Sequence, residues 1–117
     1  MEDGLSHSTI FAINQDKEGN LWFATYDGVN KYDGYNFTVY RHEYANPNSI
    51  ASDITRCIAI DDSDQIWVGT REGLSFYNRR KNSFSNYYYK KNGINVPINS
   101  IAHIKENWLM LGTAEGI

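Results

Sequence analysis

The chain has 117 residues, of which 41% are hydrophobic and 15% aromatic; this is enough apolar material for a packed core and too much for a disordered tail. Its formal net charge is −3 and its basic residues are scattered, so it lacks the basic face that a nucleic-acid partner would require. The single cysteine, Cys57, excludes an intrachain disulfide, and no apolar run approaches the roughly 20 residues that span a bilayer.

Short β-like runs follow one another along the chain, and turn-forming residues separate them. The runs are expected at about Thr9–Gln15, Leu21–Thr25, Val29–Tyr32 and Asn36–Arg41, and then at Thr55–Ile60, Gln65–Thr70, Leu74–Asn78 and Ser83–Tyr89. The Asn, Asp and Gly residues between them tolerate positive φ, and connections this short join antiparallel neighbours. Asn46–Ser49 and Lys90–Pro97 interrupt the pattern and are expected to connect one unit to the next. No segment shows sustained helical periodicity.

The second run of each set, together with the turn before it, carries a similar sequence. Asp16–Thr25 (DKEGNLWFAT) returns as Asp61–Thr70 (DDSDQIWVGT) about 45 residues later. A third, compressed copy occupies Leu109–Ile117 (LMLGTAEGI), where Met110 stands in the place of the tryptophan. Such a period marks architectures whose units bury their apolar faces against one another, so the chain is expected to be a piece of a larger repeat protein.

The apolar pattern differs between the strands of one unit. In the second run Leu21, Trp22 and Phe23 are all apolar, which predicts a strand covered on both faces. The fourth run alternates apolar and polar residues, as an outer strand would. The sequence therefore predicts an all-β protein, a β-propeller fragment of about two and a half four-stranded antiparallel blades. The blades are expected at residues 1–45, 46–92 and, incomplete, 93–117.

These residues resemble the two-component regulator propeller repeat, in which two apolar residues, an Asp and a Gly precede a Leu-Trp-Phe/Ile-Gly-Thr strand and a Gly-Leu pair. The chain departs from that pattern where Ala24 replaces the strand glycine, Asp64 replaces the turn glycine and Met110 replaces the tryptophan. The residues of the repeat signature are Asp16, Gly19, Trp22, Thr25 and Gly28, then Asp61, Trp67, Gly69, Thr70 and Gly73, and finally Gly112, Thr113 and Gly116.

The resemblance implies a function. Proteins similar to this one carry many such blades as a periplasmic sensor region, followed by a membrane span and a histidine kinase. They resemble the Bacteroides-type hybrid two-component sensors, which respond to glycans and signal through a phosphorelay. The resemblance thus implies a ligand-sensing segment of an inner-membrane sensor kinase, with no catalysis in the segment itself. Two alternatives stay open: a scaffold for protein–protein interaction and, with less support, a propeller-based carbohydrate-active enzyme, which would need paired carboxylates.

Neither a catalytic group, a cofactor nor a metal ion is expected in these residues. Asp61–Asp64 superficially resembles a calcium loop, but the central glycine and the distal glutamate of such a loop are missing. The three histidines share no ligand spacing. Trp22 and Trp67 could stack on a sugar, but their place in two-sided strands predicts that they pack between blades.

One aromatic cluster lies outside the repeat. Tyr87, Tyr88 and Tyr89, followed by two lysines, form either the outer edge of the fourth strand or a contact surface for a ligand or partner.

An incomplete stack of blades also leaves a sheet face and strand edges without partners. The partners expected are therefore the remaining blades of the parent protein, further copies of this chain, and an oligosaccharide ligand.

Overall fold

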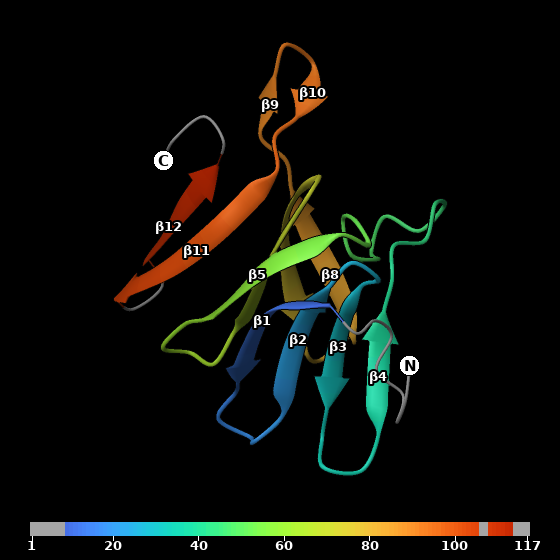
Figure 1. The fold of residues 1–117 in the computed structure, drawn as a ribbon, viewed down its shortest axis with the longest axis vertical. Helices are drawn as coiled ribbons and strands as arrows, with labels where there is room; N and C mark the ends of the chain where they lie inside the picture. The colour runs from blue at the N-terminus through green and yellow to red at the C-terminus, as the bar shows by residue number, and fades with distance from the viewer. Residues whose placement is uncertain (1–8, 106–107, 114–117) are drawn as a thin grey trace.

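The computed structural model describes residues 9–105 and 108–113, and every regular element in these residues is a β-strand (Figure 1). Blade 1 is an antiparallel sheet of β1 (Ile10–Gln15), β2 (Leu21–Thr25), β3 (Val29–Tyr32) and β4 (Phe37–Tyr40), paired in chain order. Blade 2 repeats this order with β5 (Thr55–Ile60), β6 (Ile66–Thr70), β7 (Gly73–Asn78) and β8 (Ser83–Tyr87). The predicted all-β class and the four-stranded antiparallel units are confirmed.

A third unit follows as the antiparallel pair β11 (Ile98–Lys105) and β12 (Trp108–Thr113). Strand β5 lies between β1 and β11, so the first strands of the three units adjoin at the centre of the fragment (Figure 1). We call the side of the molecule formed by β1, β5 and β11 the inner edge, because the first strands of propeller blades surround a central channel. Residues 106–107, between these two strands, lie outside the described residues.

Between blade 2 and the third unit the chain forms a small hairpin of β9 (Lys90–Lys91) and β10 (Ile94–Asn95). The expectation of a plain connection over this segment is wrong. Asn92 and Gly93 have φ values of 55° and 78°, as a two-residue type I′ turn requires, and Asn-Gly is the sequence signal for that turn. The two short strands do not show the alternation by which longer strands are recognised.

The first hairpin of every unit has the same register and the same irregularity. A one-residue shift falls between Ile10 and Ala12 in β1, between Thr55 and Cys57 in β5, and between Ile98 and Ser100 in β11. Met110 pairs with Ala102 just as Trp67 pairs with Ala59, so Met110 occupies the tryptophan position of the third unit. The third unit therefore begins as a true blade.

Two apolar clusters join the three units. The larger cluster lies between blades 1 and 2, and its buried members are Trp22, Ala24, Val29, Ile50, Ile58, Ile66, Val68, Tyr77 and Phe84. The smaller cluster lies between blade 2 and the third unit, where Cys57, Leu74 and Ile98 are buried beside half-buried Trp67, Ile101 and Leu111. Apolar area removed from water contributes about 25 cal/mol per Å². The two clusters bury such area between neighbouring units, so each blade is stabilised by packing against its neighbours.

The strand glycine of blade 2 pairs across the hairpin with a residue that has a bulkier side chain. Gly69 pairs with Cys57, and a Cβ placed on Gly69 would overlap the Cys57 sulfur. The same Cβ would come within 2.9 Å of Ile98 Cγ2 in the third unit. Glycine is therefore needed at this position for close approach of the strands and not for an unusual φ.

The other two units compensate in the same way. Gly112 pairs with Ser100, and a Cβ on that glycine would overlap the serine hydroxyl. In blade 1, where Ala24 replaces the glycine, its partner is the small residue Ala12. The departure from the repeat pattern is thus matched by a change on the facing strand, and the combined side-chain volume stays similar.

This pairing predicts a non-additive double substitution. Gly69→Ala is expected to lower the free energy of unfolding by about 1–3 kcal/mol, because the added methyl group overlaps the Cys57 sulfur. Adding Cys57→Ala should recover part of that loss, since it recreates the Ala12–Ala24 pair of blade 1. Urea unfolding of both single variants and the double variant measures the coupling. Strictly additive losses would show that the two positions do not share one space.

Candidate functional site

Each signature aspartate shapes a hairpin turn and holds the tryptophan that follows it. Asp16 Oδ1 accepts the backbone N–H groups of Glu18 and Asn20 at 3.0 and 2.9 Å. Asp16 Oδ2 accepts the indole Nε1–H of Trp22 at 2.9 Å. One carboxylate therefore satisfies two turn amides and the single polar atom of a buried ring, and each of these groups would be costly to leave unpaired.

Blade 2 repeats this arrangement. Asp61 Oδ1 accepts the N–H groups of Ser63 and Gln65, and its Oδ2 accepts the Trp67 indole N–H at 3.0 Å. The third unit, with Met110 in the tryptophan position, has no indole N–H there to satisfy. The aspartate and the tryptophan of the repeat thus work as one unit.

Both indoles lie between sheets. Trp22 is fully buried, its ring 6.0 Å from that of Tyr40 and 5.0 Å from that of Tyr77 between centroids. Trp67 is half-buried, lies 4.7 Å from the ring of Phe76 and packs against the third unit. This placement gives the two rings a packing role and leaves neither of them lining a cleft.

The signature threonines and glycines build the β2–β3 and β6–β7 turns. Thr25 Oγ1 donates to the Gly28 carbonyl at 2.8 Å, and Thr70 Oγ1 donates to the Gly73 carbonyl at 2.9 Å. Gly28 has a φ of 86° and lies against the Tyr40 backbone, so no other residue fits there without strain. Of the remaining signature residues, Gly19 lies in the β1–β2 turn, Gly112 and Thr113 lie in β12, and Gly116 lies outside the described residues.

The three consecutive tyrosines make different contacts. Tyr87 ends β8 with its ring 6.3 Å from that of Trp67, and Tyr88 lies beside Gly73. Tyr89 contributes its carbonyl, which accepts the Val96 N–H at 2.8 Å and holds the β9–β10 hairpin in place. Each side chain is about half exposed. A contact role for these tyrosines stays a prediction.

The structure brings together a set of residues that sequence reasoning did not single out. We call it the inner-edge surface, and its members are Phe11, Tyr26, Arg56, Arg71 and Asn99, all of them exposed. Phe11, Arg56 and Asn99 occupy the bulge positions of β1, β5 and β11. Tyr26 and Arg71 directly follow the signature threonines of blades 1 and 2. The signal for this surface is the β-bulge, which can be recognised only when the pairing register of the strands is known.

Direct contacts connect the members of the inner-edge surface. The rings of Phe11 and Tyr26 meet edge to face with centroids 4.6 Å apart, and Arg56 donates to Asn99 Oδ1 at 3.4 Å. The start of β5 links the two pairs: the Thr25 N–H donates to Thr55 Oγ1 at 2.8 Å, and the Arg71 N–H donates to the Ile54 carbonyl at 3.0 Å. Tyr26 and Arg71 therefore flank the first residues of β5.

A second concave region lies on the opposite rim of blade 2. A cleft of about 440 Å³ is bounded by the β5–β6 and β7–β8 turns and includes Arg80 and Lys81 in its lining. Within residues 9–105 and 108–113, no group of three or more His, Cys, Asp or Glu side chains is placed to hold a metal ion. That part of the chain also contains no helix long and apolar enough to cross a membrane.

Comparison with known proteins finds a family profile that matches two segments of the chain. The profile described as "Two component regulator propeller" matches residues 4–27 and 48–72, the first hairpins of blades 1 and 2. These two segments match the two-component regulator propeller repeat. The resemblance to this repeat noted from the sequence is thereby confirmed.

Individual relatives of these propeller repeats come from sensor proteins. A 49-residue stretch, 42% of this chain, is 49% identical to part of "Histidine kinase P4" of Formosa agariphila. Two solved structures from B. thetaiotaomicron, each 22% identical, superpose with TM-scores of 0.76 and 0.75 over 97% and 96% of this chain. They are described as extracellular domains of a hybrid two-component system, BT3049, and of a one-component system, BT4673. These likenesses confirm the propeller-blade fold.

This chain matches a small part of each relative. The chain spans 4% of the length of the histidine kinase and 14% and 15% of the two extracellular domains.

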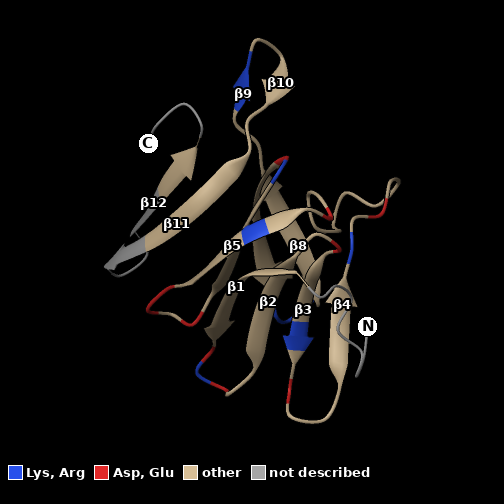
Figure 2. Cartoon of the chain, viewed as in Figure 1, with Lys and Arg blue, Asp and Glu red and all other residues tan. Residues whose placement is uncertain are grey.

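Asp64, which stands where the repeat has a turn glycine, makes a contact between blades 1 and 2. Asp64 takes a φ of 61°, as the glycine would, and its Oδ1 accepts the Lys17 backbone N–H of blade 1 at 2.8 Å. Arg79 joins the same cluster, with Asp64 Oδ2 at 3.0 Å, Glu18 Oε1 at 2.8 Å and Asp16 Oδ2 at 3.5 Å. Figure 2 shows the acidic residues of the β1–β2 and β5–β6 turns on this rim.

The ionisation of Asp16 contributes to the stability of the propeller repeats. Burial by itself raises the pKa of this carboxyl group, but hydrogen bonds from Trp22 and Asn20 and the charge of Arg79 hold the pKa below its ordinary value of 3.8. Because the pKa is lower in the folded state, the ionised group stabilises the fold above pH 3.8. This stabilisation is lost as the pH falls below 3.8 and through the folded-state pKa.

Asp16→Asn is expected to lower the free energy of unfolding at pH 7 by about 1–3 kcal/mol, because one acceptor of the turn or of the indole is lost. The difference from the unchanged chain should shrink as the pH falls below 3.8, where Asp16 also loses its charge. Urea unfolding between pH 2.5 and 7 measures it, with exposed Glu43→Gln as the control. A loss of equal size at every pH would rule out a role for the charge.

Proposed function

We propose that this chain is part of the periplasmic sensor region of a hybrid two-component histidine kinase, and that this region responds to a glycan. The observation that supports it most directly is the 49% identity to a histidine kinase over 49 residues of this chain. The fold adds support, since the same blades occur in extracellular domains described as parts of signalling systems.

The proposed mechanism needs no chemistry in this segment. The blades present exposed side chains at the inner edge on a rigid stack of sheets, and a ligand bound there, or at an interface of the propeller, favours one arrangement of a sensor dimer over another. The ligand can shift that equilibrium only by the difference in its affinity for the two arrangements. The kinase of the inner-membrane parent protein would read this shift across the membrane and start the phosphorelay.

The proposal is tested on the complete protein that contains this segment, reconstituted in nanodiscs. One class of glycan is expected to change the rate of kinase autophosphorylation several-fold, and transfer of phosphate to a receiver domain should follow. Neutral and acidic oligosaccharides are supplied separately, and buffer without glycan is the control. A parent chain without a kinase, or a kinase rate that no glycan alters, would overturn the proposal.

A second function, as an interaction scaffold, is favoured by one face of blade 1. Ile13, Leu21, Phe23, Tyr32 and Phe37 share this face by register, and none of them is buried. We call it the open face. The corresponding residues of blade 2 are Ile58, Ile66, Val68, Tyr77 and Phe84, all of which are buried against blade 1. The open face therefore has the composition that accepts the tryptophan-bearing face of another blade.

In the parent protein another blade would cover the open face, and in the isolated chain a second copy would do so. Phe23→Glu is therefore expected to shift the isolated chain from associated species toward monomer, because a charge on this face opposes burial. Light scattering after size exclusion measures the mass, and Tyr35→Glu, at a fully exposed turn, is the control. A compact monomer that unfolds cooperatively without any substitution would contradict self-association.

A further inference from the structure

The bulges of the inner edge release three positions from packing. In β5 the residues next to Arg56, Thr55 and Cys57, are buried, whereas Arg56 itself is exposed. Phe11 and Asn99 occupy the same position in β1 and β11 and are exposed as well. A bulge re-aims a side chain away from the regular pleat, and bulges are enriched beside functional sites. These three residues differ in chemistry, as expected of positions that do not maintain the repeat.

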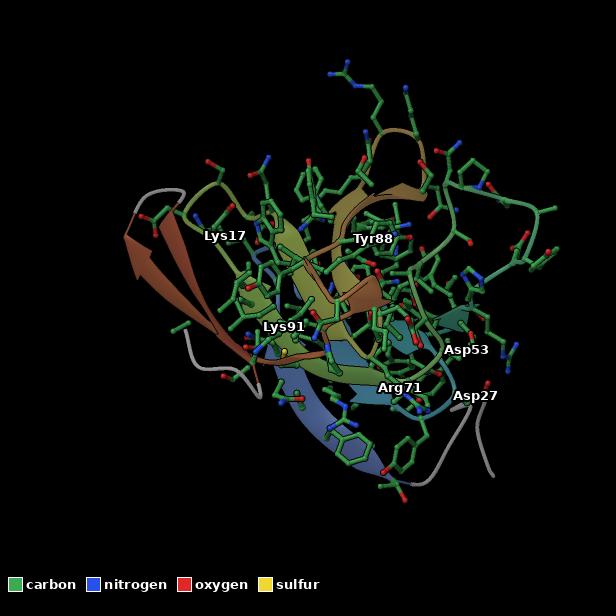
Figure 3. All side chains as sticks on the ribbon, turned by 90° about the horizontal axis from the view of Figure 1, so that it is seen from above. Lys17, Asp27, Asp53, Arg71, Tyr88 and Lys91 are labelled. Carbon is green, nitrogen blue, oxygen red and sulfur yellow. The ribbon has the colours of Figure 1, made fainter. Side chains whose placement is uncertain are left out.

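The inner-edge surface divides into an aromatic part and a cationic part. Phe11 and Tyr26, from blade 1, form an exposed pair of rings, with 44% and 47% of their surfaces accessible. Arg56 and Arg71 come from blade 2: Arg56 is the second residue of β5, and Arg71 is joined to the residue before β5 by its backbone N–H, while Asn99 adds an amide from the third unit. In Figure 3, which views the molecule from above, Arg71 and Asp27 lie toward the same side.

The carboxylates closest in sequence to this surface are engaged elsewhere. Asp27 forms a two-point contact with Arg41, at 2.9 and 3.1 Å. Asp53 accepts the His42 backbone N–H at 2.7 Å, and Glu72 accepts the side-chain amide of Asn95 at 3.2 Å.

As a result, neither Arg56 nor Arg71 has an ion-pair partner among the described residues. Two exposed guanidinium groups without carboxylate partners are available to an anion, because a guanidinium binds carboxylate or sulfate oxygens through paired hydrogen bonds.

We infer that the inner-edge surface binds an acidic oligosaccharide. The apolar face of one sugar ring lies on Phe11 and Tyr26, the carboxylate or sulfate of the next sugar is held by Arg56 and Arg71, and Asn99 bonds a hydroxyl group. This inference rests on the proposed function and adds to it the location of the site and the charge of the ligand. A neutral glycan would leave the two guanidinium groups without the anion that their arrangement favours.

Binding is tested by titration calorimetry on the 117-residue chain with tetragalacturonate as the probe. The fully methyl-esterified tetramer keeps the sugar rings and removes the charge, and inorganic sulfate supplies charge without a ring. Arg56→Ala with Arg71→Ala is expected to weaken tetragalacturonate binding at least tenfold, and Phe11→Ala should weaken it several-fold. Arg80→Ala with Arg79 and Lys81 retained is the matched control in the opposite cleft and should change nothing. Circular dichroism verifies that each variant keeps its fold.

The inference is supported if tetragalacturonate binds at least tenfold more tightly than its methyl ester, in a way that depends on both arginines and weakens with salt. If tetragalacturonate and its methyl ester bound equally tightly, the inference that the ligand is acidic would be wrong, but the proposal of glycan sensing would stand. Binding that survives the arginine substitutions but is lost on Arg80→Ala would overturn the location. If inorganic sulfate bound as tightly as tetragalacturonate, the inferred role of the sugar rings would be wrong. If tetragalacturonate did not bind at all, the inference as a whole would be wrong. Autophosphorylation of the parent protein tests the proposed function separately.

Discussion

The hydrogen bond between a buried indole and the carboxylate of the preceding turn is the interaction on which the stack of blades depends. It lets the largest side chain of the unit lie between two sheets without an unsatisfied N–H, as Trp22 does at 0% exposure. The same carboxylate closes the turn that sets the hairpin register, so local and inter-blade structure are fixed together. In the third unit, where Met110 takes the tryptophan position, a second register shift falls between His103 and Lys105.

This arrangement separates packing residues from exposed residues that packing does not constrain. The signature residues recur because each blade must fill the same space against its neighbour, and they lie between the sheets or in turns. The exposed bulge positions recur in geometry and differ in identity, so they can change without disturbing the stack. A signalling propeller built in this way can keep one scaffold while the chemistry of its inner edge diverges, which is consistent with function residing in grafted sites and not in the fold.

The architecture could be predicted from the sequence because the same pattern is written in it more than once. The two-sided apolar run around Trp22 and the Asn, Asp and Gly turns gave the strands and their antiparallel order. The inner-edge surface could not be predicted, since Phe11, Arg56 and Asn99 share no residue type and only the bulge makes them equivalent. The same holds for the partner of Ala24, because pairing across a hairpin requires the register. The β9–β10 hairpin was missed although Asn92-Gly93 carried its turn signal.

The matched volumes across the first hairpin also bear on how such arrays evolve. Gly69 faces Cys57 and Ala24 faces Ala12, so the two strands of one hairpin must be inherited together. A recombination event that moved only the second strand of blade 1 into blade 2 would bring an alanine against the Cys57 sulfur. Exchange of the entire hairpin would preserve the fit. The exchangeable module in this array is therefore the hairpin with its aspartate and tryptophan, which is also the segment that the family profile matches.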